Sequence, residues 1–149
     1  MFNSFVFLIV LALDQYSKYW AEHKLQGTEP IPVLNNLFEL HYSQNTGMAF
    51  SLFSDKPQFL FALVIVIMVS LVFYTFKEKR LDLSIAFILA GGLGNLLDRI
   101  IYGYVVDFIN PLFIDFAIFN IADISLNVGV IVLILNWIAT SSSTPRNDI

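Results

Sequence analysis

The chain has 149 residues, of which 57% are hydrophobic and 13% are charged, and its mean hydropathy is +0.72. A soluble domain of this length could not bury so much apolar surface, so the composition predicts a membrane protein with one domain, residues 1–149. The net charge is only −4 and Lys and Arg form no basic patch, so we expect no nucleic-acid partner. The chain has no cysteine, and its two histidines, His23 and His41, lack a metal-binding spacing, so we expect neither thiolate catalysis nor a metal site.

Four apolar segments are each close to the roughly 20 residues that a helix needs to cross a bilayer. They cover residues 2–20, 57–76, 81–101 and 119–140, and they predict a mainly α, polytopic membrane fold with four transmembrane helices. The first segment is interrupted by Asp14 and Lys18, whereas Phe59–Phe73 contains no charged residue. We interpret the first segment as a retained helix, because it lacks the basic start and the small-residue cleavage site of a signal peptide.

The connection between the first two segments, residues 21–56, is long enough to have a structure of its own. Leu37–Tyr42 alternates apolar and polar side chains, which is typical of a strand with one buried face. Pro30, Pro32, Asn35 and Asn36 indicate turns before this strand. We therefore expect a small β-sheet that lies on the membrane surface.

The orientation follows from the short turn Lys77-Glu78-Lys79-Arg80 between the second and third segments. Short basic loops stay in the cytoplasm, so both termini should also be cytoplasmic, including the polar tail 141–149. Residues 21–56 and 102–118 should then face the outside, which makes the expected sheet extracytoplasmic.

Polar residues gather near the outer ends of three predicted helices. At a rise of 1.5 Å per residue, each lies within roughly 10 Å of the outer end of its helix. Spacings of three or four residues also place several of them on shared helical faces. The set consists of Asp14, Lys18, Asn95, Asp98, Arg99, Asn120 and Asp123, with Asp107 in the connection before the last helix. We expect these residues to meet in one leaflet.

Asp107 and Asp123 are the candidate catalytic pair. An ionised carboxylate near hydrocarbon is costly, so an acid at membrane depth is first interpreted as functional. Two carboxylates at one site cannot both ionise cheaply, and a pair of one ionised and one protonated acid can activate water against an amide carbonyl. A structural interpretation remains open for Asp14 with Lys18, and for Arg99 with Asp98 or another acid, as buried ion pairs.

Five short boxes occur in order along the chain. They are Asp14-Gln-Tyr-Ser-Lys18, Asn45-Thr-Gly-Met-Ala-Phe50, Gly91-Gly-Leu-Gly-Asn-Leu-Leu-Asp-Arg99, Val105-Val-Asp-Phe108 and Phe119-Asn-Ile-Ala-Asp123. Together they resemble the conserved boxes of bacterial lipoprotein signal peptidase, also called signal peptidase II. The resemblance implies an aspartic endopeptidase of the bacterial cytoplasmic (inner) membrane. Such an enzyme removes the signal peptide from diacylglyceryl-modified prolipoproteins by cutting before the lipidated cysteine.

The resemblance also implies roles for individual residues. Asp107 and Asp123 would form the catalytic dyad, with the active site toward the outer face. The residues that support or line the site would be Asp14, Lys18, Asn45, Gly47, Asn95, Arg99 and Asn120. It implies prolipoproteins and membrane lipid as partners, inhibition by globomycin-type cyclic peptides, and no cofactor.

One departure and two rival functions remain. Many family members carry a Trp-Pro type of sequence before the last box, where this chain has Phe113–Ile118, and we expect Asp115 in this stretch to be a solvated loop residue. The leading alternative is a small membrane transporter or proton-path subunit, since intramembrane Asp, Lys and Arg also mark ion routes. The second is a non-catalytic assembly subunit. A transport path should place polar residues in both leaflets, whereas the second and third segments offer few on the inner side beyond Ser70, Asp82 and Ser84.

Overall fold

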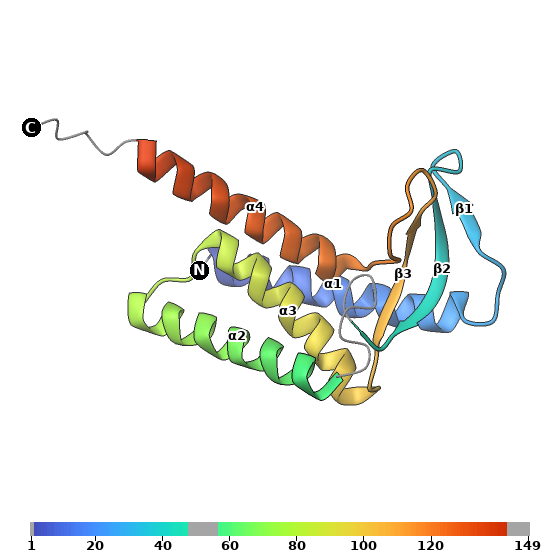
Figure 1. Cartoon of the computed structure of the whole chain (residues 1–149), viewed down its shortest axis with the longest axis horizontal. Coiled ribbons are helices and arrows are strands. Elements are labelled where there is room, and N and C mark those ends of the chain that lie inside the picture. The colour runs from blue at the N-terminus through green and yellow to red at the C-terminus, as the bar shows by residue number, and fades with distance from the viewer. Residues whose placement is uncertain (1, 48–56, 143–149) are drawn as a thin grey trace, which may run out of the picture.

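Four helices form the body of the molecule in the computed structural model, which describes residues 2–47 and 57–142. They are α1 (Phe2–Leu25), α2 (Pro57–Glu78), α3 (Leu83–Ile101) and α4 (Ile121–Ser142). Helix α3 packs against the other three, most extensively against α4 and α1. The start of α1, the end of α4 and the α2–α3 turn lie at one end of the bundle, away from a small sheet at the other end (Figure 1). The four predicted segments are therefore helices, although α1 extends five residues past its predicted end and α4 begins at Ile121 rather than at residue 119.

Three of the described helices, α2, α3 and α4, are long and apolar enough to cross a membrane. Helix α1 is not among them, because charged residues such as Asp14 and Lys18 interrupt its second half. Its first half presents apolar side chains outward, and Phe2 and Phe5 are 71% and 61% exposed. The described residues therefore confirm three candidate spans, and the fourth, α1, stays a prediction.

The bundle places polar side chains inside and apolar side chains outside. Asp14, Lys18 and Asp98 are almost completely buried, whereas Phe73 and Trp137 are exposed. Exposed apolar side chains over most of the helical surface suit hydrocarbon surroundings, where only the interior of a bundle can satisfy charged groups.

The sheet has three antiparallel strands in the order β1-β2-β3: β1 (Ile31–Val33), β2 (Phe38–Asn45) and β3 (Val105–Pro111). Leu34, Asn35 and Asn36 form the turn between β1 and β2 with positive φ angles, which asparagine tolerates better than most residues. The expected strand in residues 37–42 is confirmed as part of β2. The small sheet itself is also confirmed.

Strand β3 was not expected, and the prediction that Asp107 lies in a loop is wrong. Ser43 of β2 faces Asp107, and Asn45 faces Val105, after an irregularity between Leu40 and Ser43. The side chains of residues 105–108 are all buried, so this strand lacks the alternating pattern by which half-buried strands are detected.

A small hydrophobic core attaches the sheet to the end of α1. Ala21 and Leu25 of α1 pack with Val106 and Phe108 of β3, and all four are at least 95% buried. This contact fixes the position of Asp107, because Asp107 lies between the two core residues of β3.

Close packing of α3 against its neighbours depends on glycine. A Cβ atom at Gly91 would collide with the backbone oxygen of Ala122 in α4, and one at Gly94 would collide with the carboxylate of Asp14 in α1. Gly91 and Gly94 therefore allow a close helix approach, which brings Asp14 and the start of α4 against α3.

Candidate active site

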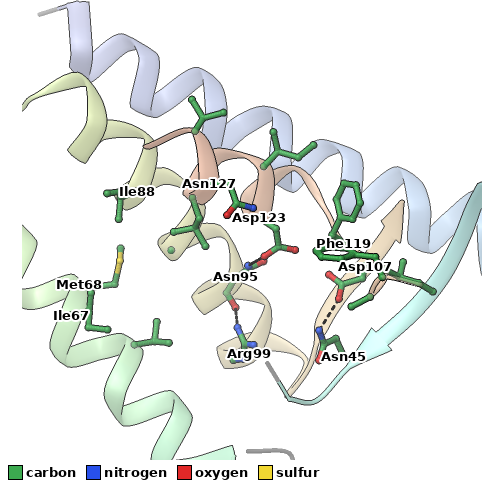
Figure 2. Close-up of a pocket in the computed structure, with 18 of the residues that line it drawn as sticks. Asn45, Ile67, Met68, Ile88, Asn95, Arg99, Asp107, Phe119, Asp123 and Asn127 are labelled. Carbon is green, nitrogen blue, oxygen red and sulfur yellow. Dashed lines mark hydrogen bonds between the residues drawn. The ribbon is translucent and has the colours of Figure 1, made fainter. Parts of the chain in front are cut away.

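Asp107 and Asp123 both line one cavity of about 640 Å³ between α2, α3, α4 and the sheet. Asp107 comes from β3 and is 2% exposed, whereas Asp123 lies in the first turn of α4 and is half-buried. The close-up in Figure 2 shows the two carboxylates on the same side of the cavity, with Asn45 beside Asp107 and Asn95 beside Asp123. The pair predicted from the sequence is thus brought to one site by a strand and a helix.

The start of α4 holds Asp123 in place through a reciprocal pair of hydrogen bonds. The backbone N–H of Asp123 donates to Asn120 Oδ1 at 3.0 Å, and the backbone N–H of Asn120 donates to Asp123 Oδ2 at 3.1 Å. This is a capping box, in which the residue before the helix and the third helical residue satisfy each other's backbone. The backbone N–H of Ala122 donates to Asp14 Oδ1 at 2.8 Å, so a third free donor of the helix start is also satisfied. Asn120 therefore precedes α4 rather than sharing a helical face with Asp123, as the sequence had suggested.

Three asparagine side chains aim their NH₂ groups at the dyad. Asn45 Nδ2 donates to Asp107 Oδ2 at 2.8 Å, Asn120 Nδ2 to Asp107 Oδ1 at 2.6 Å, and Asn95 Nδ2 to Asp123 Oδ1 at 2.8 Å. Each amide orientation is set by a donor on its oxygen: the backbone N–H of Gly47 for Asn45, Lys18 Nζ for Asn95, and the backbone N–H of Asp123 for Asn120. Because these groups can only donate, the amide oxygens turn to them and the NH₂ groups turn to the carboxylates.

Lys18 is the centre of a buried charge cluster beneath the dyad. Its Nζ lies 3.0 Å from Asp14 Oδ2 and 3.1 Å from Asp98 Oδ2, and it donates to Asn95 Oδ1 at 2.8 Å. Gln15 Nε2 contacts both of the same carboxylates, at 3.1 and 3.2 Å. The predicted intrahelical pair of Asp14 and Lys18 is therefore present, but it belongs to a larger network in which Lys18 orients a neighbour of the dyad.

Asp98, rather than Arg99, ties the segment that carries Asp107 to α3. Asp98 Oδ2 accepts the backbone N–H of Val106 at 3.1 Å, next to Asp107 in β3. The sequence predicts that Arg99 makes this tie, and the prediction is wrong, because Arg99 contacts Gly47 and Asn95 instead. Asp98 could also have been a partner of Arg99, but it pairs with Lys18 instead.

Arg99 binds the connection between α1 and α2 at Gly47. Its Nη2 donates to the backbone oxygen of Gly47 at 2.9 Å, and its Nη1 donates to the backbone oxygen of Asn95 at 3.3 Å. Gly47 in turn donates its N–H to Asn45, so Arg99 supports the segment that positions a donor to Asp107. Met48 and Phe50, the apolar residues of the second box, lie outside the described residues.

Burial raises the pKa of Asp107 from 3.8 to about 7, and the negative charge of Asp123 adds to this shift. The hydrogen bonds from Asn45 and Asn120 act in the opposite direction, because they favour the ionised form. Asp107 therefore holds a proton up to about neutral pH, as one member of an acid pair must.

Most of the residues predicted for the site do meet there. Asp14, Lys18, Asn45, Gly47, Asn95, Arg99 and Asn120 all contact the dyad or one of its immediate neighbours. The sequence placed Asp98 in the polar set but gave it no role at the site, and it did not indicate Gln15, although both residues stand inside the matched boxes. Asp115 is exposed, as expected for a solvated loop residue.

Comparison with known proteins gives a consistent match. The family model described as signal peptidase (SPase) II matches residues 6–139. Lipoprotein signal peptidases from Streptococcus thermophilus (40% identical over 132 residues, 86% of each chain) and Clostridium tetani (41% over 139 residues, 87% of this chain and 89% of the relative) are similar. A solved bacterial membrane enzyme is 31% identical and superposes with a TM-score of 0.87, covering 100% of this chain and 95% of the other. These findings confirm the resemblance that the five boxes indicated.

Proposed function

We infer that this chain, which belongs to the signal peptidase II family, removes the signal peptide from prolipoproteins as an aspartic endopeptidase. We assign Asp107 and Asp123 as its catalytic dyad and the lipidated, diacylglyceryl-modified cysteine as the residue after the cut. One observation carries the aspartic mechanism. Two carboxylates from different elements line the same cavity, and each accepts N–H donors from asparagines around it.

The two acids have different parts in the proposed reaction. Asp107 is the more buried acid and holds its proton up to about pH 7. Asp123 is the ionised partner, and the helix N-terminus that it caps favours a negative charge.

Hydrolysis then proceeds in two steps. Asp123 takes a proton from water while the water oxygen bonds to the carbonyl carbon, and Asp107 gives its proton to the carbonyl oxygen. In the second step the carbonyl re-forms and returns a proton to Asp107, the C–N bond breaks, and the leaving nitrogen receives the proton held by Asp123. In this scheme the residues around the dyad orient the two carboxyl groups and stabilise their charges. The reaction needs no cofactor.

The membrane placement is part of the proposal. The basic turn 77–80, the start of α1 and the end of α4 lie at the end of the bundle away from the dyad and the sheet (Figure 1). Basic short turns favour the cytoplasm, so we place both termini there, α1 as a fourth span, and the site at the outer face of the cytoplasmic membrane. The transporter alternative is not favoured, because the family match points to a peptidase.

The proposal is tested with the purified protein in detergent and a prolipoprotein that carries diacylglycerol on its cysteine. The parent protein should release the signal peptide, and Asp107→Asn and Asp123→Asn should each abolish cleavage, because an amide cannot shuttle the proton. Asp115→Asn is the matched control, since Asp115 is an exposed acid, and it should leave the rate unchanged. Retained activity in either dyad variant would remove the dyad assignment.

A second arm tests recognition of the lipid. Binding energy from the lipid chain can position the scissile bond, so the lipidated substrate should be cut far faster than the same peptide without lipid. Equal rates would indicate a general membrane peptidase. Adding a globomycin-type cyclic peptide to the same assay tests the expected inhibition.

A further inference from the structure

One polar side chain in the cavity takes no part in the network around the dyad. The polar residues that line the cavity are Asn45, Asn95, Arg99, Asp107, Asp123 and Asn127. The first five are joined to one another or to their neighbours by hydrogen bonds or charge interactions. Among the described residues, no hydrogen bond is formed by the Asn127 amide, which is exposed in the cavity.

The cavity around Asn127 is mainly apolar. Asn127 lies one turn along α4 from Asp123, and the lining around and beyond it is apolar, including Ile88, Met68 and Ile131. Figure 2 shows Asn127 beside Asp123, on the side of the cavity nearer to Ile88 and Met68. A substrate that fills the cavity would cover the Asn127 amide, and an amide covered without a partner in apolar surroundings costs about 1–3 kcal/mol by protein mutational data. The bound substrate is therefore expected to offer this amide a polar group.

The geometry specifies what that group is. Asn127 is the fourth residue after Asp123 in α4, which corresponds to a rise of about 6 Å. An extended chain advances about 3.3 Å per residue, so Asn127 lies level with a site about two residues from the scissile bond. A signal peptide keeps its N-terminal end in the cytoplasm, so the chain on the N-terminal side of the cut passes into the deeper part of the cavity.

A peptide segment must leave its helical form to be cut, and its backbone N–H and C=O groups then lose their internal partners. In a bilayer no water replaces these partners, so the protein must supply them. A primary amide both donates and accepts and therefore matches the N–H and C=O of one residue, whereas an ester group of a lipid offers only acceptors.

Resting on the proposed function, we propose that Asn127 binds the backbone of the substrate residue two positions on the N-terminal side of the scissile bond. Asn127 is then a substrate-positioning residue that the dyad chemistry does not require. Loss of one neutral hydrogen-bonded contact should lower kcat/KM by about three- to tenfold, mainly through KM.

The experiment combines a protein variant with a change in the substrate backbone. One lipidated peptide is normal, and the other has the N–H of the second residue before the cut replaced by an ester oxygen. The parent enzyme should cut the ester peptide about three- to tenfold less efficiently. Asn127→Leu should be weaker by a similar factor on the normal peptide and should show no further loss on the ester peptide. Asn136→Leu, the same change on an exposed residue of α4 outside the cavity, should behave like the parent.

Several outcomes would overturn the inference. Equal losses from the ester in the parent and in Asn127→Leu would mean that Asn127 does not contact that group. A coupling seen instead with an ether replacement in the diacylglyceryl group would identify the lipid as the partner of Asn127. As a control, Asn127→Leu should unfold at the same temperature as the parent, which would show that its lower cleavage rate is not caused by a folding defect. A parent enzyme that leaves the normal peptide uncut would remove the proposed function itself.

Discussion

At the residue scale, the orientation of three amides decides which groups face the carboxylates of Asp107 and Asp123. The oxygens of Asn45, Asn95 and Asn120 are each bonded to a donor, so only their NH₂ groups remain for the carboxylates. An aspartate at any of these positions would place a carboxylate oxygen, which can only accept hydrogen bonds, against a carboxylate of Asp107 or Asp123. It would also add a negative charge at the site. The three asparagines are therefore not interchangeable with their acidic counterparts.

The pH dependence follows from the same contacts. Because Asp107 has its pKa raised to about 7 and gives its proton in the reaction, kcat/KM should fall as the pH rises above about 7. The hydrogen bond from Asn45 lowers the pKa of Asp107, so Asn45→Leu should raise that pKa and move the alkaline limb to higher pH. A pH profile of kcat/KM measures this shift independently of the absolute rate.

Gln44→Leu is the control for this profile. Gln44 is the exposed neighbour of Asn45 in β2 and bonds Tyr42 rather than the dyad. The alkaline limb of the Gln44→Leu profile should lie at the same pH as that of the parent enzyme. An unmoved limb in Asn45→Leu would show that Asp107 is not the group that titrates there.

At the scale of the elements, the proposed active site is built into the beginning of a helix. Asn120 and Asp123 cap α4 while also forming part of the dyad site, and Asp14 of α1 satisfies the donor between them. The start of α4 cannot move by one residue without separating the dyad from its donors.

Two substitutions at Asn120 separate its two roles. A serine can still cap a helix but cannot donate two N–H groups, so Asn120→Ser should keep most of the stability and lose much of the activity. Asn120→Ala should lose the cap as well, with a free energy of unfolding about 1 kcal/mol lower than that of the serine variant. Thermal or denaturant unfolding in detergent, with cleavage rates alongside, makes the comparison. Equal stabilities for the two variants would count against the cap.

The contact between α3 and Gly47, in the connection between α1 and α2, gives another prediction. Arg99 donates to the backbone oxygens of Gly47 and Asn95 with different nitrogens, which a lysine cannot reproduce. Arg99→Lys should therefore lower kcat/KM by about tenfold or more, since hydrogen bonds from charged groups contribute about 1.5–3 kcal/mol. Arg80→Lys, at the exposed α2–α3 turn where Arg80 pairs with Asp82, should have little effect. Parent-like activity in Arg99→Lys would show that the anchoring of Gly47 is unimportant.

The elements differ in how far the sequence could specify them. The helices follow from long apolar runs, and their polar interruptions marked the residues of the site. Strand β3 could not be recognised, because residues 105–108 are buried on both faces and show no alternation. The tie to β3 was assigned to Arg99 instead of Asp98 for a related reason. Adjacent helical residues point in different directions, and only the packed structure shows which one meets β3 and which one meets Gly47.

At the scale of the whole molecule, Lys18 joins α1 to α3 beneath the proposed catalytic pair. It contacts Asp14 of its own helix, and Asp98 and Asn95 of α3, with a side chain that is 4% exposed. Removing one partner of a buried ion pair strands the other, which typically costs about 3–5 kcal/mol. The stability of the bundle and the position of Asn95 should therefore depend together on Lys18.

A double-mutant cycle tests this dependence. Lys18→Met should lower the free energy of unfolding strongly, and adding Asp14→Asn should recover part of the loss, because the amide can still accept the N–H of Ala122 without an unpaired charge. Thermal unfolding of the parent, both single variants and the double variant in one detergent measures the coupling. Losses that simply add would show that Asp14 and Lys18 act independently.

The i, i+4 spacing of Asp14 and Lys18 also bears on how the protein is made. Ribosomes deliver α1 first, and Asp98, Asn95 and Ala122, the later partners of this pair, emerge long afterwards. Until then Asp14 and Lys18 can neutralise each other's charge only through the 3.0 Å contact within α1. We expect α1 alone to insert in a translocation assay, and to insert less well when either charge is removed singly than when both are removed. The pair that supports the proposed site in the folded protein would then also promote the insertion of α1 into the bilayer during synthesis.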